Sequence, residues 1–174
     1  SWQHLESELS NKAIFTIEAD LVNPDTLYAG TFQQGVFKSL DGGDNWSAIN
    51  NGLIDLSVLD ILFLPGMQRL LSATETGVFY SDDGGGSWTK ANAEQDPLYG
   101  KIFLQDTTDA DTIYLGTSGF GLYVSSNNGA DWTRVNNGLT DAIINSLAHN
   151  QSGEVVAATQ TGVFKIDPAN LMND

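Results

Sequence analysis

The sequence holds few residues of the kinds that carry out catalysis, and their placement limits the available chemistry to carboxylates. There is no Cys, which excludes disulfides, thiolate chemistry and cysteine zinc sites. The two His residues, His4 and His149, are isolated in the chain and too few for a His-based metal site. No Ser/His/Asp motif, phosphate-binding loop or cofactor fingerprint is present. We therefore predict no metal, no cofactor and no catalytic residue.

Carboxylates, in contrast, are abundant in this chain of 174 residues. Asp and Glu number 22 against 7 Lys and Arg, which gives a formal net charge of -15 at pH 7. Such a charge repels phosphate backbones and anionic lipids, so nucleic acid and membrane surfaces are poor partners. We predict no membrane insertion, because no stretch approaches the roughly 18 uncharged apolar residues that a membrane span needs. A glycosidase needs two carboxylates flanking a bond, and the acids in predicted loops are Asp55, Glu75, Glu94, Asp96 and Asp141. None is singled out, because so acidic a chain places carboxylates on every face.

A repeat of about 43 residues must position these side chains. The four Trp residues are spaced 44, 42 and 44 apart, and triplets of Gly, an apolar residue and an aromatic residue keep step with them. The Trp residues are Trp2, Trp46, Trp88 and Trp132, and the triplets are Gly35-Val36-Phe37, Gly77-Val78-Phe79, Gly121-Leu122-Tyr123 and Gly162-Val163-Phe164.

Within each repeat, short runs rich in Val, Ile, Phe, Tyr and Thr are bounded by Gly, Asn and Asp, which is typical of strands. The first runs are 14–18, 59–64, 102–105 and 144–148, and the second runs are 26–31, 70–74, 112–117 and 155–159. The triplet forms a third strand, and a fourth begins at each Trp. Four short antiparallel strands per repeat are typical of a propeller blade. We predict one all-β domain over residues 1–174, a β-propeller with blade units of about 10–53, 54–97, 98–139 and 140–174, the last completed by 1–9.

The phase of the repeat predicts how the ring closes. The chain begins with a fourth strand, Trp2 to Leu5, and stops just after the third strand of the last repeat. Pairing the N-terminal strand with the C-terminal blade would complete a fourth blade and remove two exposed sheet edges. Two alternatives stay open: the chain is part of a larger propeller, or two copies share strands.

Three turns before Trp residues share one pattern. They contain Ser39, Asp41, Gly43 and Trp46; Ser81, Asp83, Gly85 and Trp88; and Ser125, Asn127, Gly129 and Trp132. The pattern resembles the Asp-box, or BNR repeat, of sialidases, sortilin-like receptors, xyloglucan-degrading hydrolases and photosystem II assembly factors of the Ycf48 type. Asn127 departs from it, because it replaces the Asp of the third box.

The box residues are predicted to hold the fold. A short Asp or Asn side chain accepts hydrogen bonds from backbone N–H groups of the following turn, Gly supplies the positive φ, and the Trp ring anchors the next strand. Calcium binding by Asp41 with Asp44, or by Asp82 with Asp83, is the alternative. The boxes lack the acidic series and closing Glu of an EF-hand, and Asn127 keeps the hydrogen bonding without the charge.

The loops between the second and third strands share one rim with the interblade connections, and this rim is the predicted ligand face. Its candidate binding residues are Phe32, Gln33, Gln34, Glu75, Phe120 and Gln160. In a four-fold ring Phe32 and Phe120 would lie on opposite blades. They either plug the mouth of the central channel or form a platform for a sugar ring or an apolar side chain of a partner.

Two functions follow from these features. We favour a non-catalytic binding or scaffolding propeller that engages a protein segment or a glycan through its rim, as a homo-oligomer or part of a larger assembly where the ring is shared. The alternative is a glycoside-acting enzyme, or a fragment of one, that uses rim carboxylates. The resemblance implies three Arg for sialidase activity, and only Arg69 and Arg134 are present, which excludes it. The resemblance also favours a secreted, periplasmic or cell-surface location.

Overall fold

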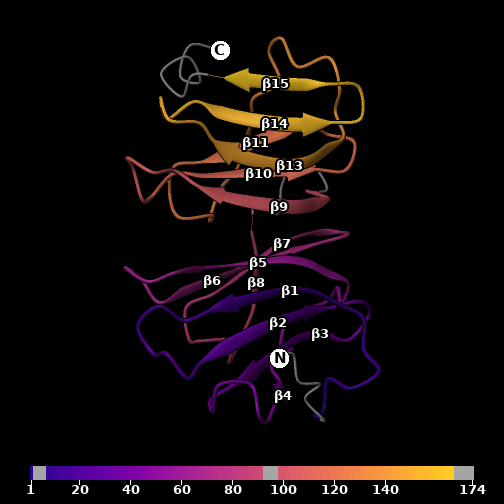
Figure 1. Ribbon diagram of the computed structural model, residues 1–174, viewed down its shortest axis with the longest axis vertical. Helices are drawn as coiled ribbons and strands as arrows, with labels where there is room; N and C mark the ends of the chain where they lie inside the picture. Colours follow the sequence, from indigo (N-terminus) through magenta and orange to yellow (C-terminus); the bar gives the residue numbers. More distant parts are fainter. Residues whose placement is uncertain (2–6, 92–97, 167–174) are drawn as a thin grey trace. The chain divides into compact units, whose positions relative to one another are not determined.

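The computed structural model describes residues 1, 7–91 and 98–166, and these residues form an all-β protein. Four antiparallel sheets follow one another along the chain, as Figure 1 shows. Three sheets have four strands in sequential order, and the last, as far as the described residues extend, has three. No helix in the described ranges is long and apolar enough to cross a membrane. The all-β prediction with four-stranded antiparallel blades is confirmed.

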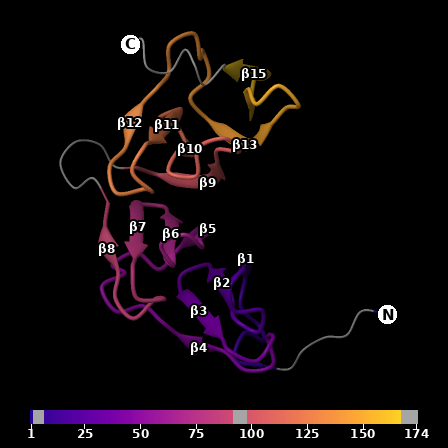
Figure 2. The same cartoon turned by 90° about the vertical axis from the view of Figure 1, so that its left-hand side faces the viewer.

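The chain divides into two compact units, Ser1–Glu75 with Phe79–Lys90 and Thr76–Val78 with Ala91–Asp174. The first two sheets contain β1 (Ile14–Ala19), β2 (Leu27–Thr31), β3 (Gly35–Ser39), β4 (Ser47–Ala48), β5 (Val58–Leu64), β6 (Arg69–Thr74), β7 (Gly77–Ser81) and β8 (Thr89–Lys90). The other two contain β9 (Gly100–Gln105), β10 (Ile113–Thr117), β11 (Leu122–Ser125), β12 (Thr133–Arg134), β13 (Ile144–His149), β14 (Val155–Thr159) and β15 (Val163–Ile166). Figure 2 shows the same strands from a second direction.

The core of the first unit lies where the sheet β1–β4 packs on the sheet β5–β8. The ring of Tyr28 on β2 stacks on Phe63 of β5 at a centroid distance of 6.3 Å. Thr16 Oγ1 donates to Asp60 Oδ1 at 3.1 Å between the two first strands. The buried cluster consists of Tyr28, Val36, Leu53, Val58, Ile61, Phe63, Leu70, Phe79 and Trp88. The sheets therefore cover each other's apolar faces.

The second unit repeats this arrangement with different residues. The ring of Tyr114 on β10 meets His149 of β13 edge to face at 6.0 Å, and His149 Nε2 lies 3.1 Å from the carbonyl oxygen of Gln105. Tyr114 stands at the register position of Tyr28, and His149 at that of Phe63. One aromatic residue on the second strand thus packs on the first strand of the following sheet in both units.

Glycine on the second strand allows this close approach. A Cβ atom added to Gly30 would lie 2.6 Å from Thr16 Cγ2 and from Val58 Cγ1. A Cβ added to Gly116, at the same register position, would lie 2.6 Å from Ile144 Cγ2. Both sites face a β-branched residue that opens the next sheet, so no larger side chain fits without displacement.

The predicted strand positions agree with the structure, apart from small shifts at their ends. The fourth strands β4, β8 and β12 contain only two residues each and begin one residue after Trp46, Trp88 and Trp132. The predicted fourth strand of the last blade, Trp2 to Leu5, lies outside the described residues. Closure of the ring and the single-domain boundaries stay predictions.

We predict that Gly30→Ala destabilises the protein by about 1 to 3 kcal/mol, because overpacking between sheets displaces Thr16 and Val58. Urea unfolding measures the loss. Gly66→Ala is the matched control, since a Cβ there meets nothing within 4 Å. Equal losses in the two variants would contradict the close packing at Gly30.

Candidate functional site: the loop rim and the box turns

The rim forms where each β-hairpin between second and third strands meets an interblade connection. In the first unit, the N–H of Gly35 donates to the carbonyl of Leu56 at 2.8 Å. In the second unit, the N–H groups of Gly119 and Gly121 donate to the carbonyl of Ala142 at 3.0 and 2.8 Å. The hairpins are therefore tied to the connections that follow the fourth strands, as the predicted rim requires within each unit.

A threonine closes each of these hairpins. Thr31 Oγ1 donates to the carbonyl of Gly35 at 2.8 Å, and Thr117 Oγ1 donates to that of Gly121 at 2.7 Å. Thr159 Oγ1 makes the same bond to Gly162 at 2.9 Å. Since the threonine hydroxyl bonds the backbone at a fixed place, the side chains between it and the glycine are presented from a constrained loop.

Two asparagines that the sequence analysis did not identify hold the hairpins through hydrogen bonds to their backbone. Asn50 Oδ1 accepts from the N–H of Val36 at 2.7 Å, and its Nδ2 donates to the carbonyl of Gln34 at 3.0 Å. Asn136 makes the same two bonds, to Leu122 at 2.8 Å and to Phe120 at 2.7 Å. The signal was available, because the sequence Asn-Asn-Gly-Leu occurs at 50–53 and again at 136–139.

An aromatic pair lies on the rim of each unit. Phe32 packs against Phe15 of β1 with a centroid distance of 5.8 Å, and the two side chains remain 40% and 49% exposed. Phe120 packs against Tyr99, just before β9, at 5.2 Å, and both are half-buried. Each pair thus offers ring faces to solvent while its rings support each other.

The other predicted binding residues are polar and exposed. Gln33 has a φ of 61° at the tip of its hairpin, and Gln34 accepts a hydrogen bond from Lys12 Nζ. Glu75 lies in the hairpin between β6 and β7, and Gln160 in the hairpin between β14 and β15. The structure brings Phe32, Gln33 and Gln34 together in one hairpin, and a binding role for any of the six residues stays a prediction.

Two of the described rim carboxylates, Asp55 and Asp141, accept hydrogen bonds from backbone N–H groups in turns. Asp55 Oδ1 accepts from the N–H of Ser57 at 3.0 Å, and Asp141 Oδ1 accepts from that of Ile143 at the same distance. Asp141 Oδ2 also accepts from the N–H and the hydroxyl of Thr161. These hydrogen bonds lower the pKa of Asp141 to about 2, and the bond from the Ile143 N–H has the largest effect. A general acid needs the opposite shift. Glu94 and Asp96 lie outside the described residues.

One described carboxyl group has the opposite shift, and it lies between sheets of the first unit. Burial raises the pKa of Glu18, the N–H of Phe63 opposes this by donating to Oε1 at 3.0 Å, and the charge of Asp60 adds to the rise. Glu18 lies on β1 at the position where Leu62 and Leu104 stand on the corresponding strands. Sequence patterning offered no signal for it.

The three box turns share one hydrogen-bond network at the opposite ends of the strands. The serine hydroxyl oxygen (Ser39, Ser81 or Ser125) accepts from the box glycine N–H at 2.8 to 2.9 Å, while the hydroxyl donates to the Asp or Asn side chain two residues on. That side chain accepts from the N–H four residues on, at 2.8 to 2.9 Å. Hydrogen bonding lowers the pKa of Asp41 and of Asp83 to about 2.

The first and third boxes carry the negative charge at different positions of the turn. Asp41 Oδ2 accepts from the Asn45 amide at 2.7 Å, whereas the Asn127 amide donates to Asp131 Oδ2 at 2.9 Å. In the second box the hydroxyl of Ser87 donates to Asp83 at 2.7 Å. In each turn the paired side chains are therefore one carboxylate and one donor, in either order. Across the described ranges, no three His, Asp or Glu side chains lie close enough together to hold a metal ion.

Solved structures similar to this chain include three kinds of protein. A GH74 xyloglucanase from Xanthomonas campestris has a TM-score of 0.68 at 17% identity, covering 91% of this chain and 30% of the enzyme. Ycf48 from Cyanidioschyzon merolae has a TM-score of 0.64 at 17% identity, covering 90% of this chain and 53% of Ycf48. The extracellular domain of a hybrid two-component system from B. thetaiotaomicron has a TM-score of 0.71 at 15% identity, covering 91% of this chain and 23% of that domain's chain.

These neighbours are β-propeller proteins, so the chain has the β-propeller fold. A further Ycf48 structure, bound to D1 peptide, has a TM-score of 0.63 at 16% identity, covering 90% of this chain and 50% of that one. The chain spans between about a quarter and about half of the length of these structures. No protein-family model matches the sequence, and no match is found among curated proteins. At such identities the likeness establishes the fold alone.

We predict that Asn45→Asp destabilises the protein at pH 7, because it sets a second carboxylate against Asp41 Oδ2. Adding Asp41→Asn restores stability, since the double variant recreates the arrangement of Asn127 and Asp131. Urea midpoints of the wild type, both single variants and the double variant complete the cycle. The loss in Asn45→Asp shrinks as pH falls below about 4, where a carboxyl group takes up a proton. Losses that simply add would contradict the shared network.

We also predict that Glu18→Gln stabilises the protein at pH 7 but not at pH 3. A carboxyl pKa raised by folding makes ionisation unfavourable in the folded state, so stability is lost as pH rises through the ordinary value of about 4.3. Glutamine keeps an oxygen for the Phe63 N–H. Thermal unfolding at the two pH values tests this, and a gain at pH 3 equal to that at pH 7 would refute it.

Proposed function

We propose that this propeller is a non-catalytic binding module whose loop rim holds an extended segment of a partner protein. The observation that carries the proposal is the exposed pair of Phe15 and Phe32 on the rim of the first unit. Two further apolar side chains in the adjoining connection are exposed, Ile54 at 76% and Leu56 at 37%. Apolar groups gathered on a constrained rim are typical of a surface that binds a partner.

The hydrogen bonding of the rim supports binding over passive packing. The loop that carries Phe32 is closed by Thr31, supported by Asn50 and tied to Leu56, so little conformational entropy is lost when a partner docks. A loop whose aromatic residue served only to fill space would bury that residue. Phe32 is 40% exposed instead.

The comparisons support a peptide as the ligand. Ycf48 is seen bound to D1 peptide, and Ycf48 has the same fold as this chain. The net charge of -15 favours a segment with basic residues. We propose that the protein acts outside the cytoplasm, because the neighbours include an extracellular domain. The Asp-box turns would then serve the fold at the ends of the strands away from the ligand.

A glycoside-acting enzyme is the second candidate, favoured by the GH74 neighbours. The described rim carboxylates argue against it, because Asp55 and Asp141 are bonded to turn N–H groups. Glu75 is the exposed acid left to test.

We predict that Phe32→Ser weakens binding of peptides selected from a phage-displayed random library by about tenfold or more, the loss typical of an aromatic anchor. Leu40→Ser is the matched control, because Leu40 is 69% exposed but lies in a box turn at the other ends of the strands. Isothermal titration with one selected peptide measures both. Equal effects of the two substitutions would refute the rim as the peptide-binding surface.

A panel of polysaccharides incubated with the protein separates the two candidates. We expect no sustained release of reducing ends. Release that is abolished in Glu75→Gln would overturn the binding proposal in favour of catalysis.

A further inference from the structure

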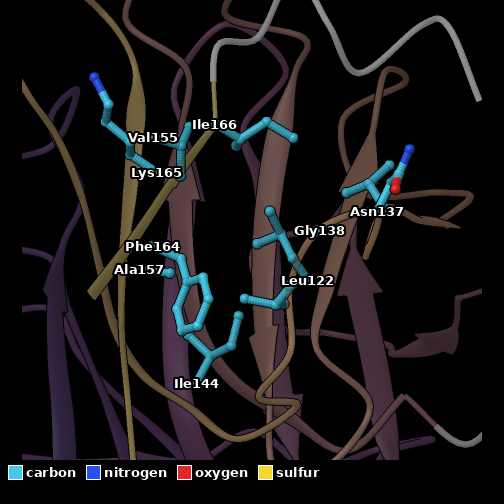
Figure 3. A pocket seen from close by; sticks show the side chains of 11 residues that line it. Leu122, Asn137, Gly138, Ile144, Val155, Ala157, Phe164, Lys165 and Ile166 are labelled. Atoms are coloured by element: carbon cyan, nitrogen blue, oxygen red, sulfur yellow. The ribbon is translucent and has the colours of Figure 1, made fainter. Parts of the chain in front are cut away.

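Apart from the rim, apolar side chains gather around a pocket of about 140 Å³ in the second unit. Figure 3 shows Leu122, Ile144 and Phe164 converging in it. Leu122 and Ile144 belong to the buried cluster of that unit, together with Val135 and Val155, which also line the pocket. The pocket is therefore continuous with the core between two sheets.

A different apolar group lies exposed in the first unit, at the ends of the strands that carry the box turns. Leu21 and Val22, in the turn between β1 and β2, are 77% and 52% exposed, and Leu40, in the first box turn, is 69% exposed. The N–H of Gly42 donates to the carbonyl of Asp25 at 2.8 Å, which ties the two turns together. Leu21, Val22 and Leu40 form what we call the turn surface.

The turn between β9 and β10, in the second unit, has the same hydrogen-bonded frame. Asp20 Oδ1 accepts from the N–H groups two and three residues on, at 2.8 and 2.9 Å. Asp106 Oδ1 accepts from the N–H groups at the same spacing, at 2.7 and 3.1 Å. The link to the box turn also recurs, because the N–H of Asn128 donates to the carbonyl of Asp111 at 2.9 Å. The two turns are therefore directly comparable.

The side chains that this frame presents differ in kind between the two units. Thr107–Thr108 stands where the first unit has Leu21–Val22, and Ser126 stands where it has Leu40. Since the frame forms with polar side chains, the fold does not require the apolar ones. Exposed apolar side chains grouped on two linked turns are typical of a surface that binds a partner.

The charges around the turn surface indicate the kind of partner. Asp25, Asp41 and Asp44 are exposed in the same two turns. The lysine nearest to them in the sequence is Lys38, and its Nζ donates to the carbonyl of Gly84 in the second box turn at 3.2 Å. The surroundings are therefore acidic. They repel anionic lipids and a second copy of this chain, and they attract Lys and Arg.

We propose that the turn surface binds a partner protein that presents an apolar stripe flanked by Lys or Arg. Leu21, Val22 and Leu40 bury their exposed area against the stripe, and the carboxylates of Asp25 and Asp44 face the basic residues. The turns keep their own hydrogen bonds, so little conformational entropy is lost on binding. The turn surface and the rim lie at opposite ends of the strands, and this proposal does not depend on the rim.

A synthetic amphipathic peptide of leucine and lysine, with leucines recurring every three or four residues, tests the turn surface. Every protein in the test carries Phe32→Ser, so that the rim lacks its aromatic anchor. The polar-turn variant adds Leu21→Thr, Val22→Thr and Leu40→Ser, which are the residues of the second unit. We expect its affinity for the peptide, measured by fluorescence anisotropy, to fall by about tenfold or more. A peptide with serine in place of leucine keeps the charge and should bind both proteins equally weakly.

The reverse substitutions are the matched control. Thr107→Leu, Thr108→Val and Ser126→Leu place the three apolar side chains on the same frame in the second unit. Asp111 and Asp131 are exposed there, so the acidic surroundings are present as well. We expect isothermal titration to show a second peptide bound per molecule of this variant. A gain of binding cannot come from a loss of folding.

Four results would overturn the proposal. The polar-turn variant could bind the leucine peptide as tightly as its parent, or the reverse substitutions could add no second peptide. Flotation with phosphatidylcholine vesicles that is lost in the polar-turn variant would assign the turn surface to lipid. A dimer in sedimentation velocity that is lost in the same variant would assign it to a second copy of the chain.

Discussion

Among the described residues of this protein, the two sheets of each unit pack face to face with no helix to cover them, so each sheet depends on its partner for burial. The contact is made in the same way twice. Tyr28 stacks on Phe63, and Tyr114 meets the ring of His149. Gly30 and Gly116 keep the strands close enough for these rings to touch. The blade is therefore not an independent folding unit, because the neighbouring sheet covers part of its buried face.

Because the burial is confined to the sheet faces, the two ends of the strands are left for different tasks. At one end, serine, glycine and a carboxylate–donor pair make a turn that is nearly the same in three blades. At the other end, threonine and asparagine hold the backbone of the hairpins while the side chains in between vary, from Phe32 and Gln33 in one to Ser118 and Gly119 in another. A fixed frame with variable side chains is what a binding surface needs.

The fold could be predicted from the sequence because its determinants are local and repeated. Tryptophan spacing, glycine triplets and β-branched runs located nearly every strand. The candidate site was harder to predict from the sequence. Asn50 and Asn136 act on hairpins 14 residues away, and only their repeated neighbours reveal them. Glu18 could not be found at all, because its raised pKa comes from burial by β5, which follows tens of residues later. Periodicity identifies the face of a strand, but not the polar atom that the neighbouring sheet presents to it.

The exchange of Asp41 and Asn45 for Asn127 and Asp131 bears on how such turns are recognised in other chains. What the fold retains is a pair of complementary side chains, and either member can hold the negative charge. In an alignment of such turns, a search that scores each position separately treats the third turn as a degenerate copy. A search that scores the two columns jointly, as covarying partners, would count it as intact. Distant propellers with few aspartates in these columns would then be found through correlated substitutions.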